Sequence, residues 1–201
     1  IIHVVPSVKG ARKAQEAGFD AVVCEGYEAG GHDGLDETCT ITLAPQVVDA
    51  VDIPVAVAGG IADGRGIAAA LVLGADGVQM GTRFVATVEC NAHNNFKQQL
   101  VEAADNGTVI TGRKINMLRS LKNPFTVRMA EAEKDGATAE ELIRLIGDEH
   151  NRAELGMIDG NVDEGVFEAG QSSGLVRDIP TVADLFERLK KEYAEAVQRV
   201  H

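Results

Sequence analysis

The stretch Pro54–Ala70, PVAVAGGIADGRGIAAA, decides the fold. It opens with a short apolar run, continues through two glycines, and reaches Asp63, a residue type that favours the N-cap of a helix. Apolar residues then recur at helical spacing until Gly74, where a glycine is expected to end the helix. The stretch therefore predicts a buried strand, a glycine-rich loop and a helix, which together make one β/α unit.

The same order of elements surrounds this stretch. We expect further strands at Ile1–Val5, Ala21–Cys24 and Gly77–Met80, and further helices at Val8–Ala17 and Thr42–Val51. Strands that alternate with helices indicate right-handed crossovers and a parallel sheet. Four such units are half of an eight-stranded barrel, and a doubly wound open sheet is the alternative that composition alone allows.

The pattern changes after Phe84. Charged segments at about 91–106 and 138–147 have helical spacing, and we expect only loops, without further buried strands, between them. A last helix follows Pro180, with Thr181 and Asp184 as its capping box. The middle of the chain is therefore expected to be a helical cap.

The predicted fold class is α/β, of the TIM (β/α)8-barrel type, with only the last four β/α units present, a helical cap region and a C-terminal helix. An open half barrel would expose sheet edges and the apolar barrel interior, so we expect an N-terminal half to be missing. The expected segments are the barrel half at 1–90, the cap at 91–160, and the return to the barrel with the C-terminal helix at 161–201.

Composition limits the classes of function. The chain has 19 Lys and Arg against 31 Asp and Glu, a formal charge of −12, which opposes binding to nucleic acid or to an anionic membrane. Cys24, Cys39 and Cys90 lack the spacing of metal ligands or of a disulfide framework, and Cys24 is expected in the core. With no apolar signal core, the sequence predicts a cytoplasmic protein without a metal site.

The loop EGYEAGGHDG at Glu25–Gly34 directly follows a predicted strand, where barrel enzymes place active-site residues. Gly30 and Gly31 would let the backbone approach a flat or anionic ligand. His32 is the residue type best suited to exchange a proton near neutral pH. The alternative is a surface turn that carries a solvated histidine.

Two further loops predict a phosphate site. Gly59 and Gly60 precede a helix whose N-terminal backbone N–H groups could bind a phosphate. In GADGVQMGTRF at 74–84, Gly81 and Thr82 lie just beyond the next strand and could bind the same group. The chain lacks the Gly-x-Gly-x-x-Gly pattern there, which disfavours a Rossmann dinucleotide site. The alternative is that both loops are tight packing turns and that Arg83 forms an ion pair.

These three segments together resemble the nitronate monooxygenase family, which also contains the flavin-dependent type II enoyl-acyl-carrier-protein reductases. LRSLKNPFTVRMAEAEK at Leu118–Lys134 and NVDEGVFEAGQSSGLV at Asn161–Val176 extend the resemblance along the chain. Many nitronate monooxygenases carry Gln where this chain has Glu25, and the reductase branch typically has Glu there. ECNAHNNFK at Glu89–Lys97 also resembles the reductase branch more closely.

The resemblance implies a protein that binds flavin mononucleotide (FMN), with His32 as the catalytic residue. It implies reduction of the 2,3 double bond of enoyl thioesters in fatty acid synthesis, with NADH or NADPH as reductant. The alternatives are oxidation of alkyl nitronates with dioxygen, and an inactive fragment or flavin-binding module. The expected partner is a small-molecule or acyl-carrier-protein-bound enoyl substrate, and a homodimer is compatible with this reading. The implied FMN contacts, with 79–82 around the phosphate, are Glu25, Gly30, Gly31, Gly59, Gly60, Gln79, Met80, Gly81, Thr82 and Gln171.

Overall fold

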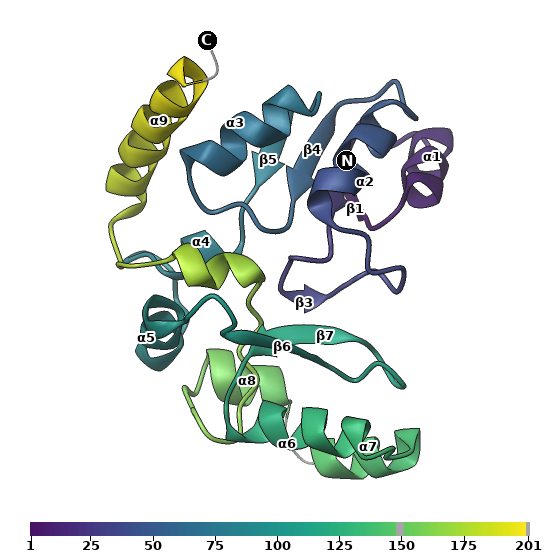
Figure 1. Ribbon diagram of the computed structural model, residues 1–201, viewed down its shortest axis with the longest axis vertical. Coiled ribbons are helices and arrows are strands. Elements are labelled where there is room, and N and C mark those ends of the chain that lie inside the picture. Colours follow the sequence, from purple (N-terminus) through teal and green to yellow (C-terminus); the bar gives the residue numbers. More distant parts are fainter. Residues whose placement is uncertain (148–150, 200–201) are drawn as a thin grey trace. The chain divides into compact units, whose positions relative to one another are not determined.

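The computed structural model describes residues 1–147 and 151–199 (Figure 1). The chain divides into two compact units, each with a hydrophobic core of its own. The expected division into 1–90, 91–160 and 161–201 stays a prediction. The first unit comprises Ile1–Ala29, Asp33–Met80 and Thr181–His201, and the second comprises Gly30–His32 and Gly81–Pro180.

A four-stranded parallel sheet forms the centre of the first unit (Figure 1). Its strands lie in the order β1-β2-β4-β5, and every neighbouring pair is parallel. The expectation of an α/β fold with a parallel sheet is therefore confirmed. The strands are β1 (Ile2–Val5), β2 (Ala21–Glu25), β4 (Val55–Ala58) and β5 (Gly77–Gln79).

The helices of the first unit begin and end at residues suited to those places. The Asp63 carboxylate accepts hydrogen bonds from the backbone N–H groups of Arg65 and Gly66, as expected for an N-cap. Thr181 likewise accepts from the Asp184 N–H at the start of the last helix. These helices are α1 (Val8–Glu16), α2 (Thr40–Val48), α3 (Gly64–Val72) and α9 (Val182–Gln198).

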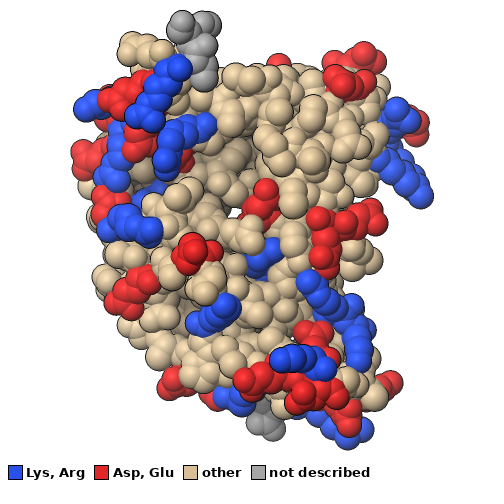
Figure 2. All heavy atoms as spheres, viewed as in Figure 1, with Lys and Arg blue, Asp and Glu red and all other residues tan. Residues whose placement is uncertain are grey.

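Helices α3 and α9 lie side by side (Figure 1). A Cβ on Gly64 would overlap the backbone of Glu192 and Tyr193, so a glycine is required there for the two helices to pack this closely. Basic and acidic side chains are interspersed over α9 (Figure 2), where Lys191 lies 3.9 Å from Glu195 one turn away. Such exposed pairs add little stability and chiefly keep the helix surface polar.

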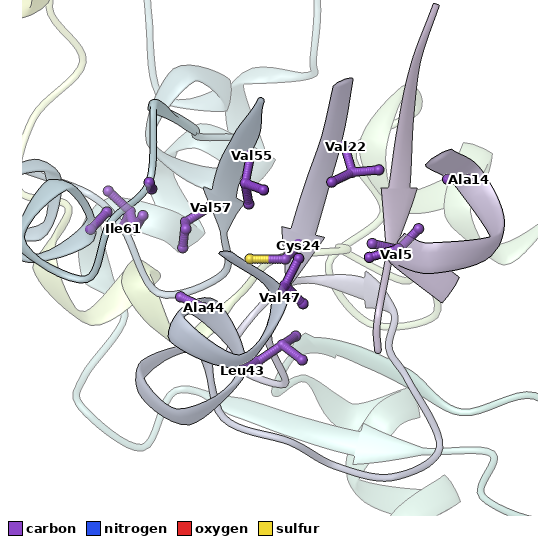
Figure 3. Close-up of a cluster of buried hydrophobic side chains, with 13 residues drawn as sticks. Val5, Ala14, Val22, Cys24, Leu43, Ala44, Val47, Val55, Val57 and Ile61 are labelled. Carbon is purple, nitrogen blue, oxygen red and sulfur yellow. The ribbon is translucent and has the colours of Figure 1, made fainter. Parts of the chain in front are cut away.

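The first core lies between one face of the sheet and the helices (Figure 3). Val22, Cys24 and Val57 of the strands meet Ala44 and Val47 of α2, and all five are at most 1% exposed. Burial raises the pKa of the Cys24 thiol to about 11, so this thiol stays protonated at neutral pH. The expected core position of Cys24 is confirmed.

The second unit contains a three-stranded antiparallel sheet, with the strands in the order β3-β7-β6. The expectation that no further buried strand follows Phe84 is therefore wrong. Each hairpin strand is only four residues long, and the buried part of β7 includes Arg119 and Ser120, which break the apolar pattern that sequence reasoning depends on. The strands are β3 (Gly31–His32), β6 (Thr108–Thr111) and β7 (Leu118–Leu121).

Helices surround this small sheet. The two expected helical segments are confirmed as α5 and α7, although α5 is shorter than predicted. Phe96 packs on Phe167 with ring centroids 5.2 Å apart in one core, and Phe125, Met129, Leu142 and Val166 form another. The helices are α4 (Thr82–Val85), α5 (Asn94–Glu102), α6 (Pro124–Lys134), α7 (Ala139–Ile146), α8 (Arg152–Met157) and the 3-10 helix η1 (Gln171–Leu175).

Within the described ranges, no helix combines the length and apolar character needed to cross a bilayer. The same residues contain no group of three or more His, Cys, Asp or Glu side chains placed to hold a metal ion.

Candidate functional site

Five of the predicted site residues lie at the carboxyl-terminal edge of the parallel sheet. Glu25 of β2 is opposite Ala58 of β4, and Ala58 is opposite Gln79 of β5. Because β4 and β5 are neighbours, the loops that begin at Gly59 and Met80 leave adjacent strands, as the predicted phosphate site requires. The first unit therefore brings together Glu25, Gly59, Gly60, Gln79 and Met80.

Gly59 and Gly60 have local reasons to be glycine. Their φ angles are +94° and +78°, in the region that side chains other than glycine rarely adopt. A Cβ at Gly59 would lie 2.6 Å from the Gly26 carbonyl oxygen, and one at Gly60 would lie 3.2 Å from Glu28 Cβ. The loop conformation thus explains both glycines without a ligand, so they do not by themselves indicate a phosphate.

Glu28 fixes the loop beside Gly60. Its Oε2 accepts hydrogen bonds from both the backbone N–H and the hydroxyl of Thr40, each at 2.8 Å, at the first residue of α2. A carboxylate at a helix N-terminus is electrostatically favourable. Glu25, in contrast, is half-buried, and burial raises the pKa of its carboxyl.

The loop Gly30–His32 belongs to the second unit. A Cβ on Gly30 would overlap the backbone of Ala169 and Gly170, and Gly31 has a φ of +88°. Both glycines are thus needed for this loop to pass close to residues 168–170. The loop leaves His32 exposed at the end of β3, which pairs antiparallel with β7.

Two hydrogen bonds fix the His32 ring. Its Nδ1 lies 3.1 Å from the Met117 carbonyl oxygen, which can only accept, so Nδ1 carries a proton. Its Nε2 lies 3.2 Å from Asn116 Nδ2, which can only donate, so Nε2 accepts. Both contacts fit a ring that is protonated on Nδ1 and accepts a hydrogen bond at Nε2 from the Asn116 amide. Sequence reasoning missed Asn116 because it is 84 residues away along the chain and no local pattern connects the two.

Gly81 differs from the other glycines of the predicted site. It is exposed, its φ is −95°, and a Cβ would meet no atom within 4 Å. Neither backbone conformation nor packing therefore requires glycine at this position. An approaching ligand would explain it, since a side chain would stand over the backbone N–H groups at the start of α4.

Thr82 links Gly81 to the last predicted residue. Its Oγ1 accepts the Gly170 N–H at 2.9 Å, beside Gln171 at the start of η1. The ion pair that the packing alternative predicts is also present, because Arg83 Nη1 lies 3.3 Å from Asp178 Oδ1. Packing thus accounts for Arg83 but leaves Gly81 unexplained.

A cavity of about 310 Å³ adjoins His32 within the second unit. Its lining includes Asn116 and Glu168 as well as apolar side chains from β7 and α6. Sequence reasoning did not find this cavity, because the antiparallel strands that help to form it were not predicted.

The fold and the site define an α/β protein with glycine-rich loops at the carboxyl end of a parallel sheet. The chain belongs to the nitronate monooxygenase family, whose family model matches residues 1–192. It is 42% identical over 144 residues to a probable nitronate monooxygenase of Staphylococcus aureus strain Newman, covering 67% of this chain and 41% of the relative. The chain therefore spans less than half the length of the curated relatives it matches.

Solved structures extend the similarity to nearly the whole chain. FabK from Thermotoga maritima has a TM-score of 0.91 and 41% identity, over 99% of this chain and 62% of that one. Nitroalkane oxidase from Streptomyces ansochromogenes has a TM-score of 0.80 and 31% identity, over 100% of this chain and 59% of that one. The chain therefore shares its fold and much of its sequence with both of these proteins over nearly its whole length.

Proposed function

We propose that this protein is an FMN-dependent oxidoreductase that reduces the 2,3 double bond of enoyl thioesters, with NADH or NADPH as reductant. The observation that carries the proposal is the similarity to FabK, an enoyl-acyl-carrier-protein reductase, which exceeds that to nitroalkane oxidase in both TM-score and identity. Glu25 supports the same choice, because the reductase branch typically has Glu at that position. The substrate would be a free or carrier-bound enoyl thioester of fatty acid synthesis in the cytoplasm.

The parallel sheet would be part of a TIM barrel, as in the neighbouring enzymes. In parallel sheets both faces are normally covered. The face of this sheet away from the first core instead lines a hollow of about 490 Å³, with Ile2 67% and Val4 42% exposed. Four further β/α units would cover that face and complete an eight-stranded barrel.

The residues proposed to contact FMN come from several loops of the chain. In the first unit, the proposed flavin contacts at the edge of the sheet are Glu25, Gly60 and Gln79. Gly81 and Thr82 would offer the phosphate an unobstructed backbone N–H and a hydroxyl at the start of α4. The remaining proposed contacts are Gly30, Gly31, Gly59, Met80 and Gln171.

When bound, FMN supplies hydride transfer from the nicotinamide to the β-carbon of the enoyl group. The contribution of His32 would be a proton at Nε2. In the state described here Nε2 accepts a hydrogen bond from Asn116, so it must gain a proton before it can donate one to the enolate that forms. Asn116 can bind either form of the ring, because its amide can rotate to present Oδ1 to a protonated Nε2.

Oxidation of alkyl nitronates with dioxygen is the second candidate. It is favoured by the curated relatives, which are named probable nitronate monooxygenases. A third candidate is a flavin-binding module without activity. Neither nucleic acid nor membrane is proposed as a partner, and a homodimer is compatible with each function.

Steady-state assays separate these candidates. The protein would be loaded with FMN, and NADH oxidation would be followed anaerobically with and without crotonyl thioester. We expect NADH consumption that depends on the thioester. Oxygen uptake with an alkyl nitronate, without thioester-dependent NADH consumption, would instead establish the monooxygenase; flavin binding without either activity would establish the module.

A further inference from the structure

The cavity beside His32 has an apolar interior and a polar mouth. Phe125, Met129 and Val166 are between 2% and 5% exposed, whereas Ile115 is 37% exposed. His32 and Asn116 are also exposed and line the same cavity. Buried apolar side chains and exposed side chains, among them His32, therefore line different parts of the cavity. Its apolar lining consists of Ile115, Leu118, Phe125, Met129, Ile146, Ala153 and Val166.

Arg152 lines the cavity, but its charge is already balanced. Its Nε donates to the Ile146 carbonyl oxygen at 2.8 Å, and its Nη1 donates to Glu164 Oε2 at 3.0 Å. Its guanidinium also stacks 4.3 Å from the centre of the Phe125 ring. Hydrogen bonds first from Arg128 and then from Arg152 lower the pKa of Glu164, so this carboxyl is ionised at neutral pH. The cavity thus offers a phosphate or carboxylate no uncommitted cation at Arg152.

Glu168 also makes the cavity unfavourable for an anionic ligand. It also lines the cavity, and its Oε2 lies within 3.2 Å of the position that a Cβ on Gly31 would take. A carboxyl group there disfavours an anionic ligand. The lining therefore favours a ligand with an uncharged apolar chain and a polar end near His32.

We propose that this cavity binds the unbranched acyl chain of the substrate and places its thioester end at His32. The inference rests on the proposed enoyl reductase function and specifies the substrate as a medium-chain acyl thioester. A volume of about 310 Å³ is at the small end of ligand pockets, which span roughly 300–1,000 Å³. It suits a hydrocarbon chain rather than a nucleotide, and a propane nitronate would leave most of it unfilled.

Chain length is the property that this cavity should control. Each buried methylene is worth about fourfold in binding, so lengthening a four-carbon chain to eight carbons should raise affinity by at least about tenfold. Ile115 is the residue to change, because it is exposed at the rim and a larger side chain there need not disturb the core. Ile158, 59% exposed in the same unit and outside the cavity lining, is the matched control.

The first arm measures turnover by the FMN-loaded protein. The kcat/KM values for crotonyl and octenoyl N-acetylcysteamine thioesters would be compared in wild type, Ile115→Trp and Ile158→Trp. We expect wild type and Ile158→Trp to prefer the octenoyl substrate by about tenfold or more, and the ratio of octenoyl to crotonyl kcat/KM to fall in Ile115→Trp, which narrows the cavity. An equal preference in all three proteins would overturn the proposal.

The second arm measures binding without chemistry. Calorimetric titration with the saturated butyryl and octanoyl thioesters measures the chain-length preference in binding. It does so even if the protein turns over neither enoyl substrate. If wild type binds the octanoyl thioester more tightly, Ile115→Trp abolishes that preference, and no turnover is seen, the proposed reductase is rejected and the acyl-chain site is retained. Turnover with no chain-length preference in either arm would keep the reductase and reject the site.

Discussion

Gly81 is the residue at which conformation and packing leave a glycine unexplained. Replacing it with Asp places a negative charge where the flavin phosphate is proposed to bind, and replacing it with Asn adds a similar bulk without the charge. We predict that Gly81→Asp weakens FMN binding at least about tenfold relative to Gly81→Asn, because like charges repel at close range. Flavin fluorescence titration gives both dissociation constants, and equal values would remove the phosphate from this position.

Gly81 is a cleaner choice for this test than Gly60. A carboxylate at Gly60 would lie against Glu28 as well as against any phosphate, since Glu28 Cδ is only 3.9 Å from the position of the added Cβ. A loss of flavin in Gly60→Asp could therefore arise from repulsion within the protein.

His32 and Asn116 form the residue pair on which the proposed proton transfer depends. Removal of a general acid typically lowers the rate by about 10²–10⁴-fold, and we expect a kcat loss in this range for His32→Ala. Asn116→Ala should lower kcat by about tenfold and change KM less, because the main role of Asn116 is to position the His32 ring. Stopped-flow measurement of flavin reoxidation checks this; a change confined to KM would assign Asn116 to substrate binding instead.

At the scale of elements, the sequence predicted the first unit well. The strand, loop and helix of Pro54–Ala70 form as expected because the apolar run, the glycines and the Asp63 cap are all local signals. The strands β6 and β7 were missed because they are short and β7 buries Arg119 and Ser120. The His32 environment was missed with them, since Asn116 reaches the ring only through that hairpin.

The packing of α3 against α9 gives a prediction about stability. A methyl group on Gly64 would overlap the α9 backbone, and the Gly64 N–H donates to Glu192 Oε2 at 3.0 Å. We predict that Gly64→Ala lowers the free energy of unfolding by about 1–3 kcal/mol, the usual cost of overpacking. Urea denaturation measures it.

Gly66→Ala is the matched control for that prediction. It lies in the same helix, and the nearest atoms to its added Cβ all belong to Ile61, the closest being the Cγ2 methyl at 3.1 Å. This variant should be close to wild type in stability, because the higher helix propensity of alanine offsets the cost of the tight methyl contact. Equal losses in the two variants would contradict the proposed role of the α3–α9 contact.

At the scale of the whole molecule, Glu25 connects stability to pH. Burial raises its pKa, so between its usual value and the raised value the folded state binds more protons than the unfolded state. The free energy of unfolding therefore falls as pH rises through that window, and the stabilising contribution is complete only below it. We predict that Glu25→Gln gains stability relative to wild type as pH rises from about 4 to about 8. Thermal unfolding across this range checks it, and a difference that does not vary with pH would refute it.

In the proposed reaction, the reduced flavin of this protein passes hydride to an enoyl thioester. The most direct measurement is an anaerobic single turnover, in which the FMN-loaded protein is reduced with one equivalent of NADH and then mixed with crotonyl thioester. We predict that the oxidised flavin absorbance returns and that one equivalent of butyryl thioester is formed. Flavin that stays reduced with the thioester, yet is reoxidised by dioxygen and reduced again by an alkyl nitronate, would contradict the claim.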